Sequence, residues 1–227
     1  MQRVIPTGCS SIDKQLGGGL LGGRLLLVYG EAETGKTTFA IQCAVNCAKT
    51  GFKTFFIDCD GAFFPRRMVQ IAAHESKEIG SQIMLMKPET LEQQAVIIDK
   101  LNEYISKKVG LIIFDTITSL YSEALGDDKQ SVFSLNRQLN RQMAYLAQIS
   151  RTQKVASLVV GQVRSVMNKY DLVQPVAMRV LKYWADAVII LNPTTEAHVI
   201  KATIKTRATQ KPSKQIFLKL GEKGLHE

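Results

Sequence analysis

The sequence has little cysteine and no long apolar run, and these shortages exclude several classes of protein. Only four of its 227 residues are cysteines, which does not look like a disulfide framework in a chain of this size. No apolar run approaches the roughly 18–20 residues that span a bilayer, and the first residues carry no signal-peptide core. We therefore expect a globular protein that stays in the cytoplasm.

The cysteines also lack the spacing of a metal site. Cys43 and Cys47 are four residues apart and would share a helix face, which is one pattern that can ligate a metal. No Cys-x-x-Cys pattern and no paired histidines complete such a site. We expect these two residues, with Cys9 and Cys59, to be small buried thiols.

Charge is abundant but unevenly placed. The 29 Lys and Arg residues outnumber the 20 Asp and Glu residues, which gives a formal net charge of +9. Residues 1–150 hold 16 basic and 15 acidic side chains, whereas residues 151–227 hold 13 and 5. This basic final third suggests a surface that faces a polyanion such as nucleic acid. Lysines that are merely solvated are the alternative.

Short apolar runs alternate with segments of helical periodicity. Runs that are apolar at nearly every position are typical of parallel strands covered on both faces, whereas steps of three or four residues indicate helices. One such helix covers 132–149, and Thr90 with Gln93 forms a capping box ahead of another. The pattern predicts one doubly wound α/β domain over residues 1–227, with a mostly parallel sheet and a C-terminal antiparallel hairpin. The expected strands are 24–29, 54–59, 83–86, 111–114, 157–161 and 187–191, and the hairpin comprises 199–207 and 215–220.

The strongest motif is GEAETGKTT at residues 30–38, which fits the phosphate-loop pattern G-x-x-x-x-G-K-[ST]. An apolar strand precedes it and a helical segment follows it, as this motif requires. Its backbone N–H groups would cradle the phosphates of ATP, Lys36 would reach the β- and γ-phosphates, and the Thr37 hydroxyl would ligate Mg²⁺. The expected ATP-binding residues are Gly30, Glu31, Ala32, Glu33, Thr34, Gly35, Lys36, Thr37 and Thr38.

Three polar residues at strand ends complete the expected site. Asp115 follows four apolar residues and would hold Mg²⁺ through water together with Thr37. Asp58 and Asp60 are two candidates for the base that orients the attacking water. Gln162 follows another apolar strand and could sense the γ-phosphate, because an amide both donates and accepts hydrogen bonds.

The ordered set of motifs resembles the RecA/RadA recombinase superfamily, and most closely its short archaeal RadA paralogues. Residues 7–19 (TGCSSIDKQLGGG) look like the family segment ahead of the phosphate loop, and 56–61 (FIDCDG), followed by Pro65-Arg66-Arg67, resemble the next motif. Asp115 and Gly161-Gln162-Val163 match in order and approximate spacing. The resemblance implies a RecA-like core, a role in recombination and repair, and partners such as RadA or a Holliday-junction nuclease.

Two departures from the family pattern change the expected activity. The family's catalytic glutamate falls on Asp60, whose side chain is one methylene shorter. Since a misplacement of about 1 Å can cost about 100-fold in rate, we expect slow ATP hydrolysis. The sequence also begins directly at the core, without RadA's N-terminal DNA-binding domain or the linker that anchors one subunit on the next. We therefore expect no strand exchange by this chain alone.

By analogy with the family, two loops would face DNA. The first, 122–131, is acidic apart from Lys129, which supports phosphate binding only weakly. The second, 164–179, is basic and contains an aromatic residue that could stack on a base. The expected DNA-binding residues are Arg164, Lys169, Tyr170, Arg179 and, just beyond the loop, Lys182.

Lys205-Thr206-Arg207 resembles the K-x-R finger of KaiC-like relatives, which reaches a neighbouring subunit's phosphates. The same cations could instead contact DNA or lie on a plain exposed hairpin. The leading hypothesis is an accessory protein that binds ATP and DNA in recombination and repair. A KaiC-like ATPase switch that acts through assembly, and an active recombinase, are the alternatives.

Overall fold

The computed structural model describes residues 3–125, 129–162, 174–207 and 214–227. Within these ranges, a nine-stranded sheet runs through the molecule in the order β11-β10-β9-β8-β3-β7-β6-β4-β5. No helix in the described part of the chain has both the length and the apolar character needed to cross a membrane.

The sheet is parallel from β8 to β5 and antiparallel from β8 to β11, so the predicted fold class is confirmed. The antiparallel end contains one more strand than the predicted hairpin, because β11 pairs with β10 and forms the outer edge. The strands are β3 (Leu25–Gly30), β4 (Lys53–Asp58), β5 (Ile83–Met86), β6 (Val109–Asp115), β7 (Ala156–Gln162), β8 (Ala187–Pro193), β9 (Val199–Thr206), β10 (Lys214–Gly221) and β11 (Gly224–His226). A separate pair, β1 (Val4–Ile5) and β2 (Leu20–Leu21), is antiparallel.

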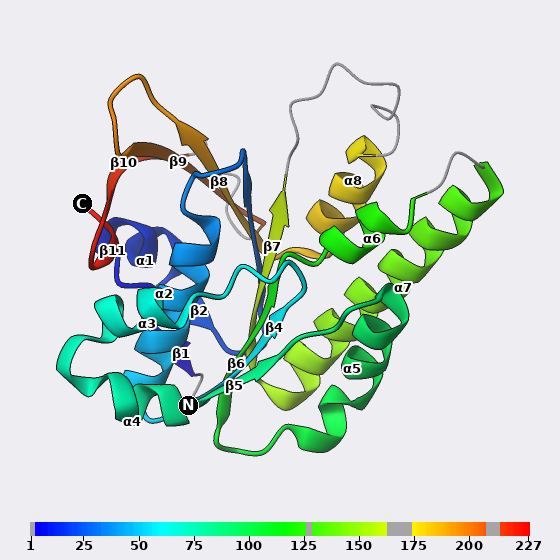
Figure 1. Ribbon diagram of the computed structural model, residues 1–227, viewed down its shortest axis with the longest axis horizontal. Coiled ribbons are helices and arrows are strands. Elements are labelled where there is room, and N and C mark those ends of the chain that lie inside the picture. The colour runs from blue at the N-terminus through cyan, green and yellow to red at the C-terminus, as the bar shows by residue number, and fades with distance from the viewer. Residues whose placement is uncertain (1–2, 126–128, 163–173, 208–213) are drawn as a thin grey trace.

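Helices cover both faces of the sheet (Figure 1). One layer contains α1 (Ser10–Leu16), α2 (Lys36–Lys49), α3 (Pro65–Ala72) and α4 (Ser76–Ser81), with a short 3₁₀ turn at Ala73–Glu75. The other layer contains α5 (Leu91–Tyr104), α6 (Ser119–Glu123), α7 (Lys129–Gln153) and α8 (Gln174–Trp184). Because the parallel strands have a hydrophobic layer on each side, their nearly continuous apolar sequences are explained.

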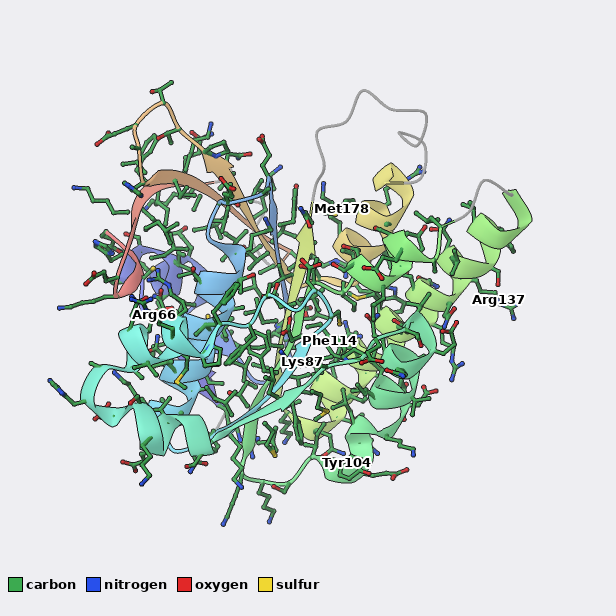
Figure 2. All side chains as sticks on the ribbon, in the orientation of Figure 1. Arg66, Lys87, Tyr104, Phe114, Arg137 and Met178 are labelled. Carbon is green, nitrogen blue, oxygen red and sulfur yellow. The ribbon has the colours of Figure 1, made fainter. Side chains whose placement is uncertain are left out.

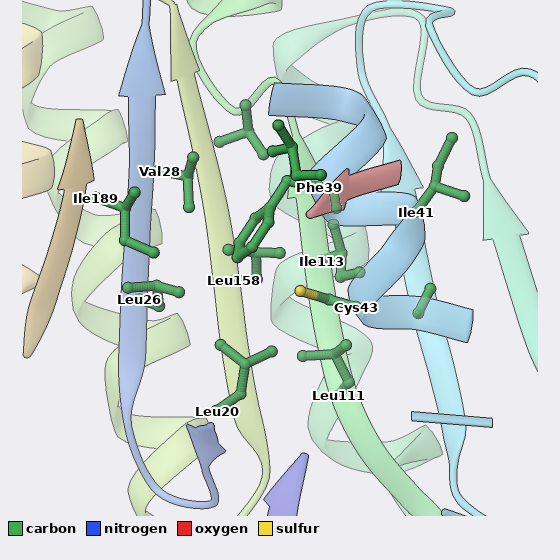
Figure 3. Packing of buried hydrophobic residues seen from close by; sticks show 14 of the residues in the cluster. Leu20, Leu26, Val28, Phe39, Ile41, Cys43, Leu111, Ile113, Leu158 and Ile189 are labelled. Atoms are coloured by element: carbon green, nitrogen blue, oxygen red, sulfur yellow. The ribbon is translucent and has the colours of Figure 1, made fainter. Parts of the chain in front are cut away.

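Strand β6 illustrates this two-sided burial. Leu111 and Ile113 pack into the core under α2, which Figure 3 shows, whereas Ile112 and Phe114 point into the core under α7. All four side chains have no exposed surface. A strand held this way is rigid, so it fixes the position of Asp115 at its end.

The predicted strands agree with the observed ones to within one or two residues. The capping box differs in detail: the Thr90 hydroxyl accepts from the Gln93 N–H at 3.2 Å, but the Gln93 side chain accepts from the N–H of Glu89, not of Thr90. The cysteine prediction is confirmed, since all four thiols are buried and free. Burial raises the pKa of Cys9 and of Cys47 to about 11, so these two stay protonated at neutral pH.

Two expected loops are shorter than the sequence suggested. The segment 164–179 ends in helix, because α8 begins at Gln174, so Arg179 lies on a helix and not in a loop. The segment 122–131 begins inside α6 and ends inside α7, which starts at Lys129. Both loops are expected from the family analogy and not from the local pattern; Val176, Ala177 and Met178 are apolar, which fits the helix found there.

Candidate nucleotide site and basic surface

The phosphate loop joins β3 to α2, and its glycines are required by the packing around them. A Cβ on Gly30 would lie 2.0 Å from the carbonyl oxygen of Leu191 in β8, a distance that no side chain tolerates. Gly35 has φ +82°, a left-handed conformation that favours glycine. The loop therefore curls back on itself directly before α2. The first backbone N–H groups of this helix have no partner within it, which suits them to bind an anion.

Lys36, the first residue of α2, is held inside the loop. Its side chain is buried, and its Nζ donates a hydrogen bond to the carbonyl oxygen of Glu31, which also accepts from the Thr34 hydroxyl at 2.9 Å. Burial lowers the pKa of Lys36, while the charges of Asp115 and Asp60 oppose this change. The ammonium group thus lies within the electrostatic reach of both predicted carboxylates.

Asp115 is fully buried at the end of β6. Its Oδ1 accepts a long hydrogen bond of 3.3 Å from the Thr116 hydroxyl, and its Oδ2 has no partner among the described residues. Burial raises the pKa of Asp115 to about 6, and the neighbouring hydroxyl groups of Thr37 and Thr116 limit the rise. The peptide bond between Asp115 and Thr116 is cis.

These residues fit Mg²⁺ bound mainly through nucleotide and water. Mg²⁺ keeps several waters and takes only one or two protein oxygens when phosphates complete its shell. Asp115 supplies an unpartnered acceptor beside Thr37, a pair of the required kind. Within the described ranges, no group of three or more His, Cys, Asp or Glu residues forms a metal site that could do without the nucleotide.

Most of the predicted nucleotide-site residues line one cleft of about 350 Å³, and Asp115 is buried next to Thr116 at its edge. Lys36 and Thr37 form its floor at the start of α2, while Asp60, Thr116 and Gln162 border it from the ends of three different strands. Those strands are parallel, so their carboxyl ends meet at the same edge of the sheet. The cleft is where the topology places a ligand in an open α/β sheet.

The structure separates the two aspartates that follow β4. Asp58 is buried and accepts hydrogen bonds from the N–H groups of Ala62 (2.9 Å) and Phe63 (3.2 Å), with Lys87 3.7 Å away. It therefore holds the turn after β4 in place. Asp60 is exposed and lines the cleft, so of the two candidates for the base only Asp60 reaches the site.

Sequence reasoning gave no role to Arg67, which also lines the cleft. From α3, Arg67 donates to the carbonyl oxygens of Gly221 (2.6 Å) and Glu222 (3.1 Å) in the turn between β10 and β11. Leu220 of β10 adds an apolar wall close to Gly35. The C-terminal strands thus form part of the cleft, a long-range contact that local periodicity does not reveal.

Lys205 and Arg207 lie away from this cleft. In the sheet, Lys205 of β9 pairs with Val188 of β8. Gly30, the first residue of the phosphate loop, pairs with Leu191, which lies three residues further along β8. Lys205 and Arg207 are exposed, and the Arg207 guanidinium lies 5.8 Å from the centre of the Tyr183 ring. The finger residues therefore do not border their own chain's phosphate loop.

The expected DNA-binding residues are only partly described. Arg164, Lys169 and Tyr170 lie outside the described residues. Arg179 and Lys182 are exposed on α8, and the Lys182 ammonium lies 4.6 Å from the centre of the Tyr29 ring, one residue before the phosphate loop. Arg137, on the outer side of the adjacent helix α7, is exposed as well (Figure 2). The structure thus places exposed cations on the α7–α8 layer.

Comparison with known protein families gives a match over nearly the whole chain. The family model described as Rad51 matches residues 2–225. This match agrees with the order of the motifs and with the sheet topology described above.

Two curated relatives of similar length carry the same description. A "DNA repair and recombination protein RadB" of Methanosphaera stadtmanae is 30% identical over 225 residues, which cover 98% of this chain and 95% of that protein. The protein of the same description from Archaeoglobus fulgidus is 31% identical over 227 residues, covering 99% of both chains.

A solved structure agrees in fold over the same length. The structure titled "Crystal structure of the RadB recombinase" matches with a TM-score of 0.81 and 26% sequence identity, and the match covers 99% of each chain.

Proposed function

The chain belongs to the Rad51 family, among the RadB proteins of DNA repair and recombination, and from this premise we propose that it is an accessory protein that binds ATP and DNA. ATP would act mainly as a ligand that changes the conformation of the protein, and it would be hydrolysed slowly. Proteins of this family bind ATP and generally require Mg²⁺, which agrees with the residues that line the cleft.

The observation that carries this proposal is the convergence of Lys36, Thr37 and Asp115 at one end of the sheet. The α2 N-terminus and Lys36 would bind the phosphates, and Thr37 with Asp115 would hold Mg²⁺. Bound Mg²⁺ would neutralise charge on the phosphates. Because Lys36 and Asp115 are both buried, their interactions with a ligand would be screened little by solvent.

Hydrolysis requires a water molecule that is held and deprotonated beside the γ-phosphate. Asp60 would act as the base, and the Gln162 amide would contact the γ-phosphate. The aspartate side chain is one methylene shorter than the glutamate of the family pattern. We propose slow hydrolysis for this reason.

DNA would bind through basic residues that follow Gln162 along the chain. Arg164, Lys169 and Tyr170 remain a prediction from the sequence, together with Arg179 and Lys182 of α8. Contacts of this kind neutralise phosphates without reading bases, so we expect binding to single-stranded, duplex or branched DNA and no site specificity. RadA or a Holliday-junction nuclease are the partners that this role suggests.

The test is DNA binding measured at several salt concentrations, with and without ATP and Mg²⁺, on all three DNA forms. We expect the affinity to fall steeply with salt and to change when ATP is bound. Lys36→Ala, which lacks the phosphate-binding ammonium, should abolish the effect of ATP while leaving DNA binding in its absence unchanged. Binding that is insensitive to salt, or absent at low salt, would contradict the proposal.

One observation favours a second function. Lys205 and Arg207 are exposed and distant from their own phosphate loop, so they could reach a nucleotide only on a neighbouring subunit. A KaiC-like switch would use them this way. ATP-dependent assembly that is lost in Arg207→Ala, with DNA binding unaffected, would support that function over the first.

A further inference from the structure

Two buried glutamines are hydrogen-bonded to each other next to the segment that follows β6. Gln94 of α5 has no exposed surface and Gln142 of α7 has 3%. The Gln94 Nε2 donates to the Gln142 Oε1 at 2.7 Å and to the carbonyl oxygen of Ile117 at 3.3 Å. This pair therefore links two helices of one layer to the backbone two residues beyond Asp115.

The pair is poorly explained by stability alone. Gln94 Oε1 and Gln142 Nε2 are buried and have no hydrogen-bond partner among the described residues. Unpaired polar groups of this kind are unfavourable in a protein interior, and two leucines would fill a similar volume without them. Since the surrounding cluster is apolar, a property other than packing is the better reason for two amides at this place.

Ile117 is held from two sides. Its carbonyl oxygen accepts from Gln94, and its N–H donates to the carbonyl oxygen of Val160 in β7 at 3.1 Å. Between Ile117 and Asp115 lies Thr116, which borders the cleft and donates to Asp115. The segment is thus held between β7 and Gln94. β6 fixes the backbone of Asp115 from one side, and this segment fixes the backbone that follows it, which orients the Thr116 hydroxyl and the Asp115 carboxylate that accepts from it.

We propose that Gln94 and Gln142 are positioning residues for the Mg²⁺–nucleotide site. Gln142 orients the Gln94 amide, Gln94 holds the Ile117 carbonyl, and Ile117 fixes the backbone that presents Asp115. Neither glutamine touches the nucleotide. This inference rests on the proposed function, because it assigns the pair to the Mg²⁺ end of the proposed ATP site.

The test is the affinity for a non-hydrolysable ATP analogue, measured by calorimetry with Mg²⁺ and again with EDTA. The ratio of the two affinities is the Mg²⁺ enhancement. Groups that orient a metal ligand change metal affinity by about 10–100-fold when they are replaced. We therefore expect Gln94→Leu/Gln142→Leu to reduce the Mg²⁺ enhancement at least about tenfold, with the affinity in EDTA unchanged.

The double variant is chosen because it removes both amides together, so neither glutamine is left without its partner; the Ile117 carbonyl oxygen loses the Gln94 hydrogen bond, which is the contact under test. Its thermal unfolding midpoint should fall by only a few degrees, because one backbone acceptor loses its donor. Should it fail to fold, Gln142→Met replaces one amide with a chain of similar length, and it should reduce the enhancement by a smaller factor.

A matched control exists in the same layer. The Ser150 and Ser157 hydroxyls form a buried 2.6 Å hydrogen bond between α7 and β7, and no residue of the cleft takes part. Ser150→Ala/Ser157→Ala should leave the Mg²⁺ enhancement unchanged.

Three outcomes are decisive. If the parent chain binds no ATP, the proposed function fails. If it shows a Mg²⁺ enhancement that the glutamine variants retain, the positioning role is overturned. If the variants lose affinity equally in Mg²⁺ and EDTA, the glutamines support the fold in general, and the positioning role is again overturned.

Discussion

Gln42 in the middle of α2 is hydrogen-bonded twice to the backbone of Leu225 in β11. Its Oε1 accepts from the Leu225 N–H at 2.7 Å, and its Nε2 donates to the Leu225 carbonyl oxygen at 3.0 Å. The same Nε2 donates to the carbonyl oxygen of Thr7 at 2.9 Å. One buried amide thus joins the helix of the phosphate loop to segments near both ends of the described chain.

We expect Gln42→Leu to lower the free energy of unfolding by about 2–4 kcal/mol, because it leaves buried backbone groups of Leu225 and Thr7 without this partner. Urea denaturation followed by circular dichroism measures the change. Gln148→Leu, at an exposed position on α7, is the control and should shift stability by less than about 0.5 kcal/mol. Equal effects of the two changes would refute the role of Gln42.

Asp115→Asn should make the nucleotide-free protein more stable at pH 8 than its parent. Burial raises the pKa of Asp115 from 3.8 to about 6, so between these pH values the folded chain holds a proton that the unfolded chain has lost. The free energy of unfolding of the parent therefore falls as pH rises through this window and stays lower above it. Two pKa units correspond to about 3 kcal/mol.

The gain in Asp115→Asn should approach this value at pH 8 and disappear below about pH 3, where the parent carboxyl is largely neutral in both states. Denaturation in EDTA across this range measures it. Asp60→Asn, which removes an exposed carboxylate of the same cleft, should give no comparable gain. A constant difference between Asp115→Asn and its parent at all pH values would show that burial of the charge is not its cause.

Asp60→Glu should raise the rate of ATP hydrolysis several-fold. The added methylene extends the carboxylate into the cleft, towards the place where the attacking water would lie. Steady-state phosphate release measures the rate. Asp60→Asn, which cannot accept the proton, is the matched control and should fall below the parent. If folding and ATP binding are intact and Asp60→Glu gives no increase, chain length at this position is not what limits turnover.

Replacing Arg179 or Lys182 by Gln should weaken DNA binding similarly for all sequences. Each lost phosphate contact should reduce the slope of log affinity against log salt by about 0.9 on duplex DNA. Fluorescence anisotropy at four or more salt concentrations measures the slope. Lys77→Gln, an exposed cation of α4 on the opposite layer, should leave it unchanged. An unchanged slope in both α8 variants would remove this helix from the DNA surface.

The sheet and the phosphate loop could be predicted from sequence because their signals are local. β6 is apolar at successive positions since both of its faces are covered, and residues 30–38 are constrained by the backbone path that a phosphate requires. The same holds for Asp115, whose place after a buried strand follows from the pattern alone.

Other features depend on contacts between distant residues and carry no local signal. Asp58 and Asp60 are two positions apart in one turn, and only the hydrogen bonds from Ala62 and Phe63 distinguish the buried one from the one in the cleft. Likewise, nothing near Arg67 in the sequence indicates that it will contact Glu222, 155 residues away. Such pairs are decided by topology, which periodicity does not report.

The position of β11 beside α1 and α2 (Figure 1) has a consequence for synthesis on the ribosome. Gln42 and Leu225 are 183 residues apart, and Leu220 forms a wall of the cleft. When the phosphate loop leaves the ribosome, Leu220 and Leu225 have not yet been synthesised. Contacts between residues so far apart in sequence also form slowly. ATP would therefore stabilise the completed fold more than a partly synthesised chain without β10 and β11.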